Sequence, residues 1–391
     1  MVRVAYLQSI SVTPGTFARP DHRSCDDCPT PCRETKFVET LDGRKLTYVE
    51  FGDPSSPLVI HNHGGPSSRL EGRLLANGAT SNGLRLVSVD RPGIGRSTPQ
   101  KYRSYESWAS DLLTIADALG YQEFGVSGWS EGGPWPLAAA AYLDPARLRH
   151  VTSIAGGNYG TFGDMWAAKF MDKIDTVGGQ LALHHKFAFH LMYEILALDA
   201  EHFRKSSIKT LIKLVSEYDA KLLSVPAISE AFADMSAECF AQGSGPLVDD
   251  AELLYRQWDF DVTRISRPVH MWQGTEDHLV PYPINKEISD RMPASVWHEV
   301  DGCGHLGPVD GFDEDEAKCE GDDGSVVLGR LLTAKRDALE ALQLAHGLLD
   351  ASPSSVKQLG EECGPVLCGA LVRNGRTDPP RAGRLTIGPG S

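Results

Sequence analysis

The stretch that decides the fold is Gly128-Trp129-Ser130-Glu131-Gly132, in which a serine has a glycine two residues away on either side. This Gly-x-Ser-x-Gly spacing is typical of a sharp turn from a strand into a helix that leaves the serine hydroxyl exposed. Glycine suits such a turn because a tight turn crowds any Cβ at those positions. The pattern alone is common, so the flanking sequence must decide how it is interpreted.

The flanking sequence supplies the strand and the helix that this turn requires. Residues 123–127 are consistent with a short buried strand, and residues 137–143 are rich in alanine and leucine, as in a helix. Pro134 and Pro136 lie in the first turns of that helix. Because proline lacks a backbone donor, we expect the first turn to be distorted.

Composition excludes several classes of protein. The chain has 391 residues, 41% of them hydrophobic, which suffices for a full core in one large or two ordinary domains. A formal net charge of −14 argues against nucleic acid or an anionic membrane surface as the main partner. The hydrophobic windows are too short to span a bilayer, and residues 1–12 lack a secretory signal, so we expect a soluble, cytoplasmic protein.

The cysteines give no clear site. Cys25, Cys28 and Cys32 form a cluster near the N-terminus, with His22 as the nearest histidine. A structural zinc ion needs four ligands, so free thiols in an irregular leader are favoured over a zinc site. Disulfides are expected less still, because no secretion signal precedes them.

Two segments upstream of the turn at 128–132, called the elbow from here on, also have recognisable turns. Asp42-Gly43 lies between strand-like residues 37–41 and 46–51, which predicts a β-hairpin. An apolar strand at 57–60 leads into His63-Gly64-Gly65-Pro66, a glycine turn that can point a backbone N–H outward. An ordinary loop turn is the alternative interpretation of this second segment.

A third motif follows the strand at 84–89 and reads Asp90-Arg91-Pro92-Gly93-Ile94-Gly95-Arg96-Ser97. Residues 105–119 then have the pattern of an amphipathic helix. Together with the His-Gly-Gly-Pro turn and the serine elbow, this order of motifs resembles the alpha/beta hydrolase superfamily. The resemblance covers residues 36 to about 308 and implies an α/β fold. In such a fold we expect a mostly parallel central sheet flanked by helices, with an inserted helical cap.

The resemblance also implies an acid and a base downstream of Ser130. The segment 274–281, Gly-Thr-Glu-Asp-His-Leu-Val-Pro, is similar to the family's acid loop and gives Asp277 the acid position, with Glu276 as the competitor. The segment 301–305, Asp-Gly-Cys-Gly-His, resembles the family's Gly-x-Gly-His ending, so His305 is the expected base.

Two backbone N–H groups complete the implied site. By resemblance the oxyanion hole is formed by the N–H groups of Gly65 and of Glu131, the residue after the nucleophile. Neither a metal nor an organic cofactor is required by this chemistry.

The motif order also divides the chain. We expect an irregular leader at 1–35, an alpha/beta hydrolase core at 36–156 and 246–308, and a helical cap at 157–245. Beyond the core we expect an acidic loop at 309–324, a C-terminal helix at 325–350 and a disordered tail at 351–391.

The expected function is hydrolysis of a carboxylic ester of a small to medium, mainly apolar substrate, by a monomer or homodimer with no nucleic-acid partner and no membrane span. Haloalkane dehalogenases and epoxide hydrolases would have an aspartate in place of Ser130. Proline iminopeptidases share the His-Gly-Gly-Pro turn, but Ser67 and Glu131 depart from their pattern. Such an aminopeptidase is one alternative, and a low-turnover relative that binds a small molecule is the other.

Overall fold

The structure, a computed structural model, describes residues 35–202 and 204–307. Almost all of the expected leader, with the cysteine cluster of Cys25, Cys28 and Cys32, lies outside these residues. The expected acidic loop, C-terminal helix and tail lie outside them as well.

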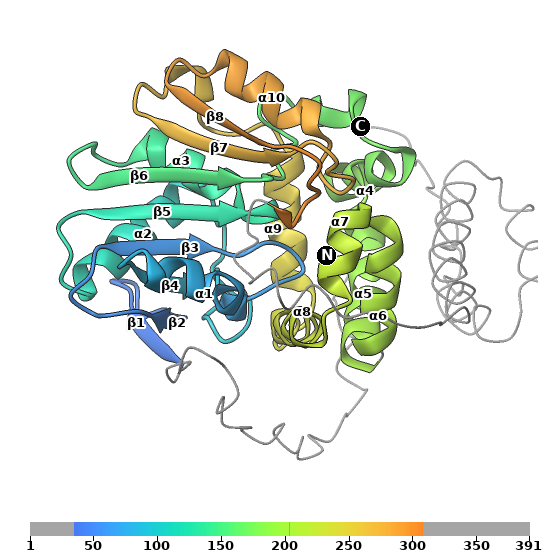
Figure 1. Cartoon of the computed structure of the whole chain (residues 1–391), viewed down its shortest axis with the longest axis horizontal. Helices are drawn as coiled ribbons and strands as arrows, with labels where there is room; N and C mark the ends of the chain where they lie inside the picture. Colours follow the sequence, from blue (N-terminus) through green and yellow to red (C-terminus); the bar gives the residue numbers. More distant parts are fainter. Residues whose placement is uncertain (1–34, 203, 308–391) are drawn as a thin grey trace, which may run out of the picture. The chain divides into compact units, whose positions relative to one another are not determined.

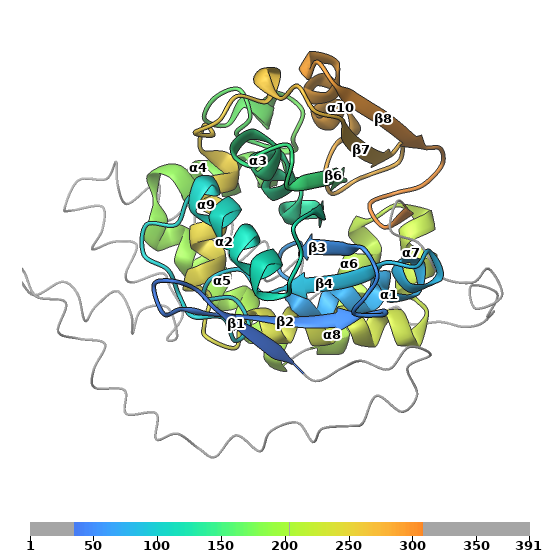
Figure 2. The ribbon, with the colours of Figure 1, turned by 90° about the vertical axis from the view of Figure 1, so that its left-hand side faces the viewer.

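A sheet of eight strands forms the centre of the described part, in the order β1-β2-β4-β3-β5-β6-β7-β8. β2 pairs antiparallel with β1 and with β4, and all other neighbours pair parallel. Figure 2 shows β1 and β2 at one end of the sheet and β7 and β8 at the other. The strands are β1 (Lys36–Glu39), β2 (Lys45–Phe51), β3 (Leu58–Asn62), β4 (Arg85–Val89), β5 (Phe124–Trp129), β6 (Leu148–Ile154), β7 (Val269–Gly274) and β8 (Ser295–Val300).

The hairpin predicted at Asp42-Gly43 joins β1 to β2. Gly43 has a φ of 80°, a conformation that glycine adopts without a steric cost. The turn is closed by a hydrogen bond from the Thr40 N–H to the Arg44 carbonyl at 2.8 Å. The sequence prediction of this hairpin is therefore confirmed.

Helices cover both faces of the sheet, because successive side chains of each strand point to opposite faces. On β4, Val87 and Val89 join the main core cluster, whereas Leu86 packs with Ala76 on the other face. The main cluster contains side chains of α2, α3 and α10, and the smaller cluster belongs to α1. The flanking helices are α1 (Gly72–Ser81), α2 (Tyr105–Ala118), α3 (Pro134–Tyr142) and α10 (Tyr282–Arg291). These layers confirm the expected α/β fold.

Six helices are inserted between β6 and β7. Figure 1 shows them beyond the carboxyl ends of the parallel strands, the edge at which ligands bind in open α/β sheets. The last of them falls in the range expected to be core, yet it packs against α4 and α5 while its Leu254 joins the main core. The inserted helices are α4 (Lys173–His184), α5 (Lys186–His202), α6 (Arg204–Leu214), α7 (Glu217–Leu223), α8 (Pro226–Cys239) and α9 (Gly245–Tyr255).

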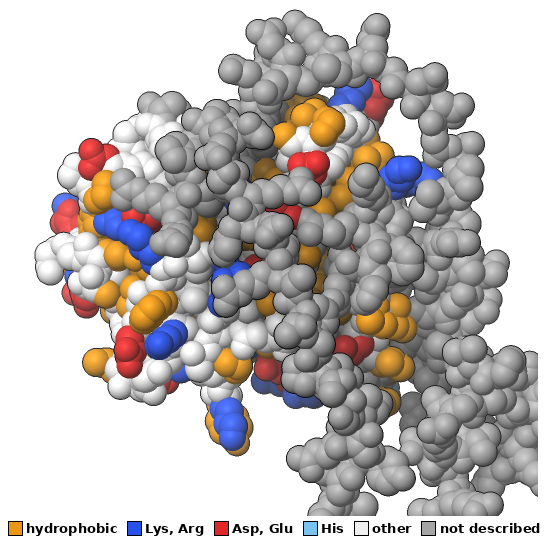
Figure 3. All heavy atoms as spheres, turned by 90° about the horizontal axis from the view of Figure 1, so that it is seen from below, with side chains coloured by type: hydrophobic (Ala, Val, Ile, Leu, Met, Phe, Trp, Pro, Cys, Tyr) orange, Lys and Arg blue, Asp and Glu red, His pale blue; other side chains and the backbone are white. Residues whose placement is uncertain are grey.

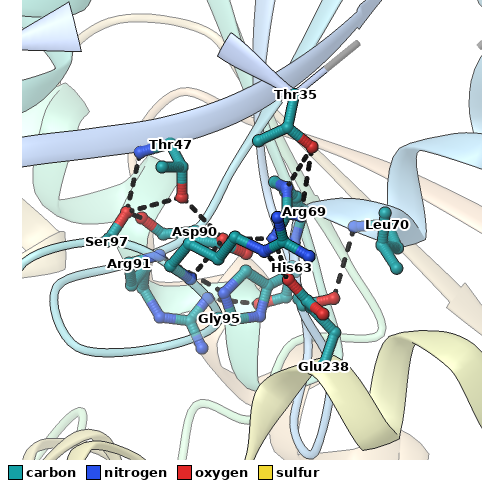
Figure 4. A network of polar contacts seen from close by, with 12 residues as sticks. Thr35, Thr47, His63, Arg69, Leu70, Asp90, Arg91, Gly95, Ser97 and Glu238 are labelled. Carbon is teal, nitrogen blue, oxygen red and sulfur yellow. Dashed lines mark hydrogen bonds and ion pairs between the residues drawn. The ribbon is translucent and has the colours of Figure 1, made fainter. Parts of the chain in front are cut away.

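A buried polar network around Asp90 joins this insertion to the core (Figure 4). The Asp90 carboxylate accepts hydrogen bonds from the Arg69 backbone N–H and side chain, both at 2.7 Å, and from the Thr47 hydroxyl at 2.8 Å. Arg69 also donates to Glu238 of α8 at 2.8 Å. Because Asp90 and Arg69 are 0% and 2% exposed, these contacts hold the loop after β4 and helix α8 in fixed relation.

One face of the described residues is not strongly charged (Figure 3), and these residues contain neither a membrane-spanning helix nor a cluster of metal ligands. On the face shown in Figure 3, acidic, basic and hydrophobic side chains of the described residues are interspersed, without one sign of charge predominating. No helix among the described residues is long and apolar enough to cross a membrane. Within residues 35–202 and 204–307, no group of three or more His, Cys, Asp or Glu side chains is arranged to hold a metal ion.

Candidate functional site

Ser130 lies directly after β5, at the start of a single 3-10 turn, Ser130–Gly132. Its φ of 57° is in the left-handed region, which costs energy for a residue with a side chain and is typical of functional sites. The two glycines are required by close packing: a Cβ on Gly128 would lie 2.1 Å from the Gly132 carbonyl oxygen, and one on Gly132 would lie 2.1 Å from the Asn62 carbonyl oxygen. The expected strand, turn and helix are therefore present.

The two prolines after the elbow lie within the first turn of α3, which begins at Pro134. The distortion that the sequence predicts there is not seen: the helix is regular from Pro134, and the 3-10 turn at Ser130–Gly132 precedes both prolines. Pro136 leaves no donor missing there, because the first N–H groups of a helix have no intrahelical acceptor.

Asp277 lies in the loop after β7 and is held by four donors. Its Oδ1 accepts from the backbone N–H groups of Leu279 and Val280, each at 2.9 Å. Its Oδ2 accepts from Gln273 Nε2 and contacts His305 Nδ1, each at 2.8 Å. Glu276, the competitor for the acid position, is exposed. The structure therefore brings Asp277 to His305.

His305 is 3% exposed and is fixed from two sides. Its backbone N–H donates to Asp219 of α7 at 2.6 Å, and the same carboxylate accepts from Leu306 at 3.0 Å. Trp129, the residue before Ser130, donates to the His305 carbonyl at 3.0 Å, and the two rings lie 5.3 Å apart. The inserted helices thus hold the loop that carries His305.

The electrostatics of this pair favour a charged imidazole. Burial by itself lowers the pKa of His305, but the charge and the hydrogen bond of Asp277 outweigh burial, so the pKa is raised above its usual 6.5. The nearby carboxylates of Asp219 and Glu71 act in the same direction. A proton transferred to His305 would therefore be stabilised in place.

The turn at Gly64 and Gly65 lies against the elbow. A Cβ on Gly64 would lie 3.0 Å from Ser130 Cβ. The Gly64 N–H is held by the Glu71 carboxylate at 3.0 and 3.1 Å, whereas the N–H groups of Gly65 and Glu131 have no acceptor among the described residues. The Ser130 hydroxyl likewise makes no hydrogen bond within the part of the chain that the structure describes. These three groups are therefore available to a ligand.

Two supporting residues were not identified from the sequence. Asp219 lies 86 positions before His305, in a helix whose pattern indicates only packing. Glu71 accepts from His61 at 2.8 Å as well as from Gly64, and nothing in its local sequence marks it as buried. Both act by placing a backbone loop, so no motif of their own could have found them.

Comparison with known proteins agrees with this architecture. The family model described as alpha/beta hydrolase fold matches residues 57–312. A proline iminopeptidase from Lacticaseibacillus rhamnosus is 26% identical over 290 residues, which cover 69% of this chain and 91% of the relative.

Two solved structures show the same fold. A bromoperoxidase from Bacillus anthracis is 19% identical with a TM-score of 0.51, and the match covers 71% of this chain and 95% of that chain. An esterase from Thermogutta terrifontis is 16% identical with a TM-score of 0.51, and the match covers 80% of this chain and 100% of that chain. With the family model covering more than half of its length, the chain belongs to the alpha/beta hydrolase fold family.

Proposed function

We propose that this protein is a serine hydrolase that cleaves a carboxylic ester of a small to medium, mainly apolar substrate. The observation that carries the proposal is the buried contact between His305 Nδ1 and Asp277 at 2.8 Å. The same histidine contacts Trp129, the residue before Ser130, and Ser130 itself has a positive φ. A base oriented by a carboxylate and close to a serine hydroxyl is the arrangement that nucleophilic acyl transfer needs.

In the proposed reaction, Ser130 Oγ attacks the ester carbonyl carbon while His305 Nε2 takes the hydroxyl proton. Asp277 holds the Nδ1–H and stabilises the imidazolium that forms. The N–H groups of Gly65 and Glu131 receive the oxyanion. Collapse breaks the ester bond, and His305 returns the proton to the leaving alcohol. Water, with His305 again as base, then releases the acid and restores Ser130.

A second candidate is an aminopeptidase, favoured by the relative named a proline iminopeptidase that matches 69% of the chain. Amide and ester cleavage share the same serine chemistry, so the triad does not separate them. Ser67 after Pro66 and the Trp129-Ser130-Glu131 sequence at the nucleophile depart from the pattern of those peptidases, which supports the ester hydrolase instead.

The test is release of p-nitrophenol from acetate, butyrate and octanoate esters by the wild type, Ser130→Ala and Ser110→Ala. Removing the nucleophile should lower kcat by about 10³-fold or more. The exposed Ser110 on α2 is the matched control and should leave turnover unchanged. Turnover that survives Ser130→Ala would contradict the mechanism. Failure on every ester, with cleavage of aminoacyl anilides, would instead support the aminopeptidase.

A further inference from the structure

The side chain of Glu131 is placed where a substrate would be held. Its Oε2 is enclosed and has no hydrogen-bond donor among the described residues. The carboxylate lies against Gly65, since a Cβ built there would overlap Oε2 at 1.9 Å. Both residues also carry the N–H groups proposed to receive the oxyanion. An anionic group therefore lies beside the position of the reacting carbonyl.

Among the described residues, no cation neutralises Glu131 by direct contact. Burial raises its pKa to about 7, which the charge of Arg91 opposes and that of Asp250 reinforces. Arg91 donates instead to Asp250 at 2.8 Å and to the carbonyl oxygens of His63 and Gly64. A carboxylate oxygen that is enclosed without a donor is costly, so its persistence points to a partner that arrives with a ligand.

Aromatic side chains complete the surroundings of this carboxylate. A Cβ built on Gly157 would lie 3.3 Å from the Tyr159 ring and 3.4 Å from Glu131 Cα, so Tyr159 lies beside Glu131. Burial raises the pKa of Tyr159, Tyr193 and Tyr255, and the charge of Glu131 acts on each in the same direction. Tyr159 and Tyr255 stack with ring centroids 5.0 Å apart. Their hydroxyls have no hydrogen-bond partner among the described residues. A carboxylate beside tyrosine rings and open hydroxyls is suited to an organic cation.

We propose that Glu131 binds a protonated amine on the acyl part of the substrate, so that the preferred substrates are esters of α-amino acids with apolar side chains. The proposal rests on the proposed function and narrows its substrate class. An α-amine is attached to the carbon next to the carbonyl, so it reaches a carboxylate that borders the oxyanion site. The bound ammonium also offsets the repulsion between Glu131 and the developing oxyanion.

The first test compares two substrates that differ only in the amine: L-leucine benzyl ester and benzyl 4-methylpentanoate. At about pH 7 the wild type should prefer the amino ester in kcat/KM by ~10-fold to 100-fold, and Glu131→Gln should abolish that preference. Glu276→Gln, the same change at an exposed position nearby, should preserve it. An equal preference in wild type and Glu131→Gln would overturn the proposal.

A binding measurement separates this proposal from the proposed function. In Ser130→Ala, calorimetry should show L-leucinamide binding about 10-fold or more tighter than 4-methylpentanamide, and the difference should vanish in Ser130→Ala/Glu131→Gln. Equal binding of the two amides by Ser130→Ala would overturn the amine site even if both esters are hydrolysed. Amine-dependent binding with no ester turnover in the wild type would support the amine site and contradict the ester hydrolase.

Discussion

Two carboxylates belong to the candidate site, and they differ in how the protein surrounds them. Asp277 is 6% exposed and receives four donors: two backbone N–H groups, Gln273 and His305. Glu131 has an enclosed Oε2 that receives none from the described residues. The comparison teaches that hydrogen bonding fixes a buried carboxylate in one orientation, whereas a missing donor leaves binding capacity for a ligand.

The same contrast appears in the support of the two groups. Asp277 is joined through Gln273 to Asn285, whose side chain donates to Gln273 Oε1 at 2.7 Å and to the Gly156 carbonyl at 3.0 Å. This chain of donors orients the carboxylate toward His305. Glu131 instead lies against Gly65 and beside Tyr159, and neither supplies a donor to the enclosed Oε2. This comparison can be tested by neutralising carboxylates that accept several hydrogen bonds, Asp277 and Asp90, and the one whose Oε2 accepts none, Glu131.

The largest effect is expected for Asp277→Asn. Losing the charge that orients and stabilises the imidazolium should lower kcat/KM by about 10⁴-fold. Because Asp277 raises the pKa of His305, the residual activity should also begin at lower pH than in the wild type. A pH profile of kcat/KM on one p-nitrophenyl ester measures both. Glu276→Gln is the control and should leave kcat/KM unchanged. A comparable loss in this variant would contradict the assignment of Asp277 as the acid.

A smaller effect, on folding rather than catalysis, is expected for Asp90→Asn. Like Asp277, Asp90 is a buried carboxylate that accepts several hydrogen bonds. Substitution by asparagine removes the negative charge that is paired with the buried Arg69. Breaking a buried pair costs about 3–5 kcal/mol of unfolding free energy. Urea denaturation measures this cost. In the control Asp117→Asn, whose carboxylate is 56% exposed beside Arg147, the loss should stay below about 1 kcal/mol. A similar loss in both variants would contradict the prediction.

The smallest effect is a gain in stability for Glu131→Gln. In the folded protein the pKa of Glu131 rises from 4.5 to about 7, so its ionisation opposes folding. The cost is absent below about pH 4.5, grows as pH rises toward 7 and is constant above it, at no more than about 3 kcal/mol. Urea denaturation should therefore show little difference between variant and wild type at about pH 4 and a gain of about 1–3 kcal/mol at about pH 8. A loss of stability at pH 8 would mean that Glu131 has a structural partner.

Motifs with local geometric causes could be predicted from the sequence. The hairpin at Asp42-Gly43 and the glycines of the elbow follow from steric limits on the backbone, which act within a few residues. Asp277 and His305 were assigned through the resemblance of their loops to those of the alpha/beta hydrolases, and the structure brings the two side chains together. Their catalytic roles, and that of Ser130, stay predictions.

Contacts between distant segments could not be predicted in this way. The pairing of Asp219 with the His305 loop joins positions 86 residues apart, and the network of Asp90, Arg69 and Glu238 joins the core to α8. The pattern of an amphipathic helix states which face is buried but not which polar group it meets. The end of the insertion could not be predicted for the same reason. The sequence assigned α9 to the core, but α9 packs on both the inserted helices and the core.

By itself, the sequence determined the succession of strands and helices along the chain and the turn that carries Ser130, because these depend on backbone sterics and on periodicity. The two loops that carry its expected partners were found through their resemblance to the family's motifs. Only the tertiary structure decided which carboxylates receive hydrogen bonds. Whether Asp277 receives four donors and Glu131 Oε2 none depends on what the fold packs around them, since burial and hydrogen bonding are properties of neighbours in space.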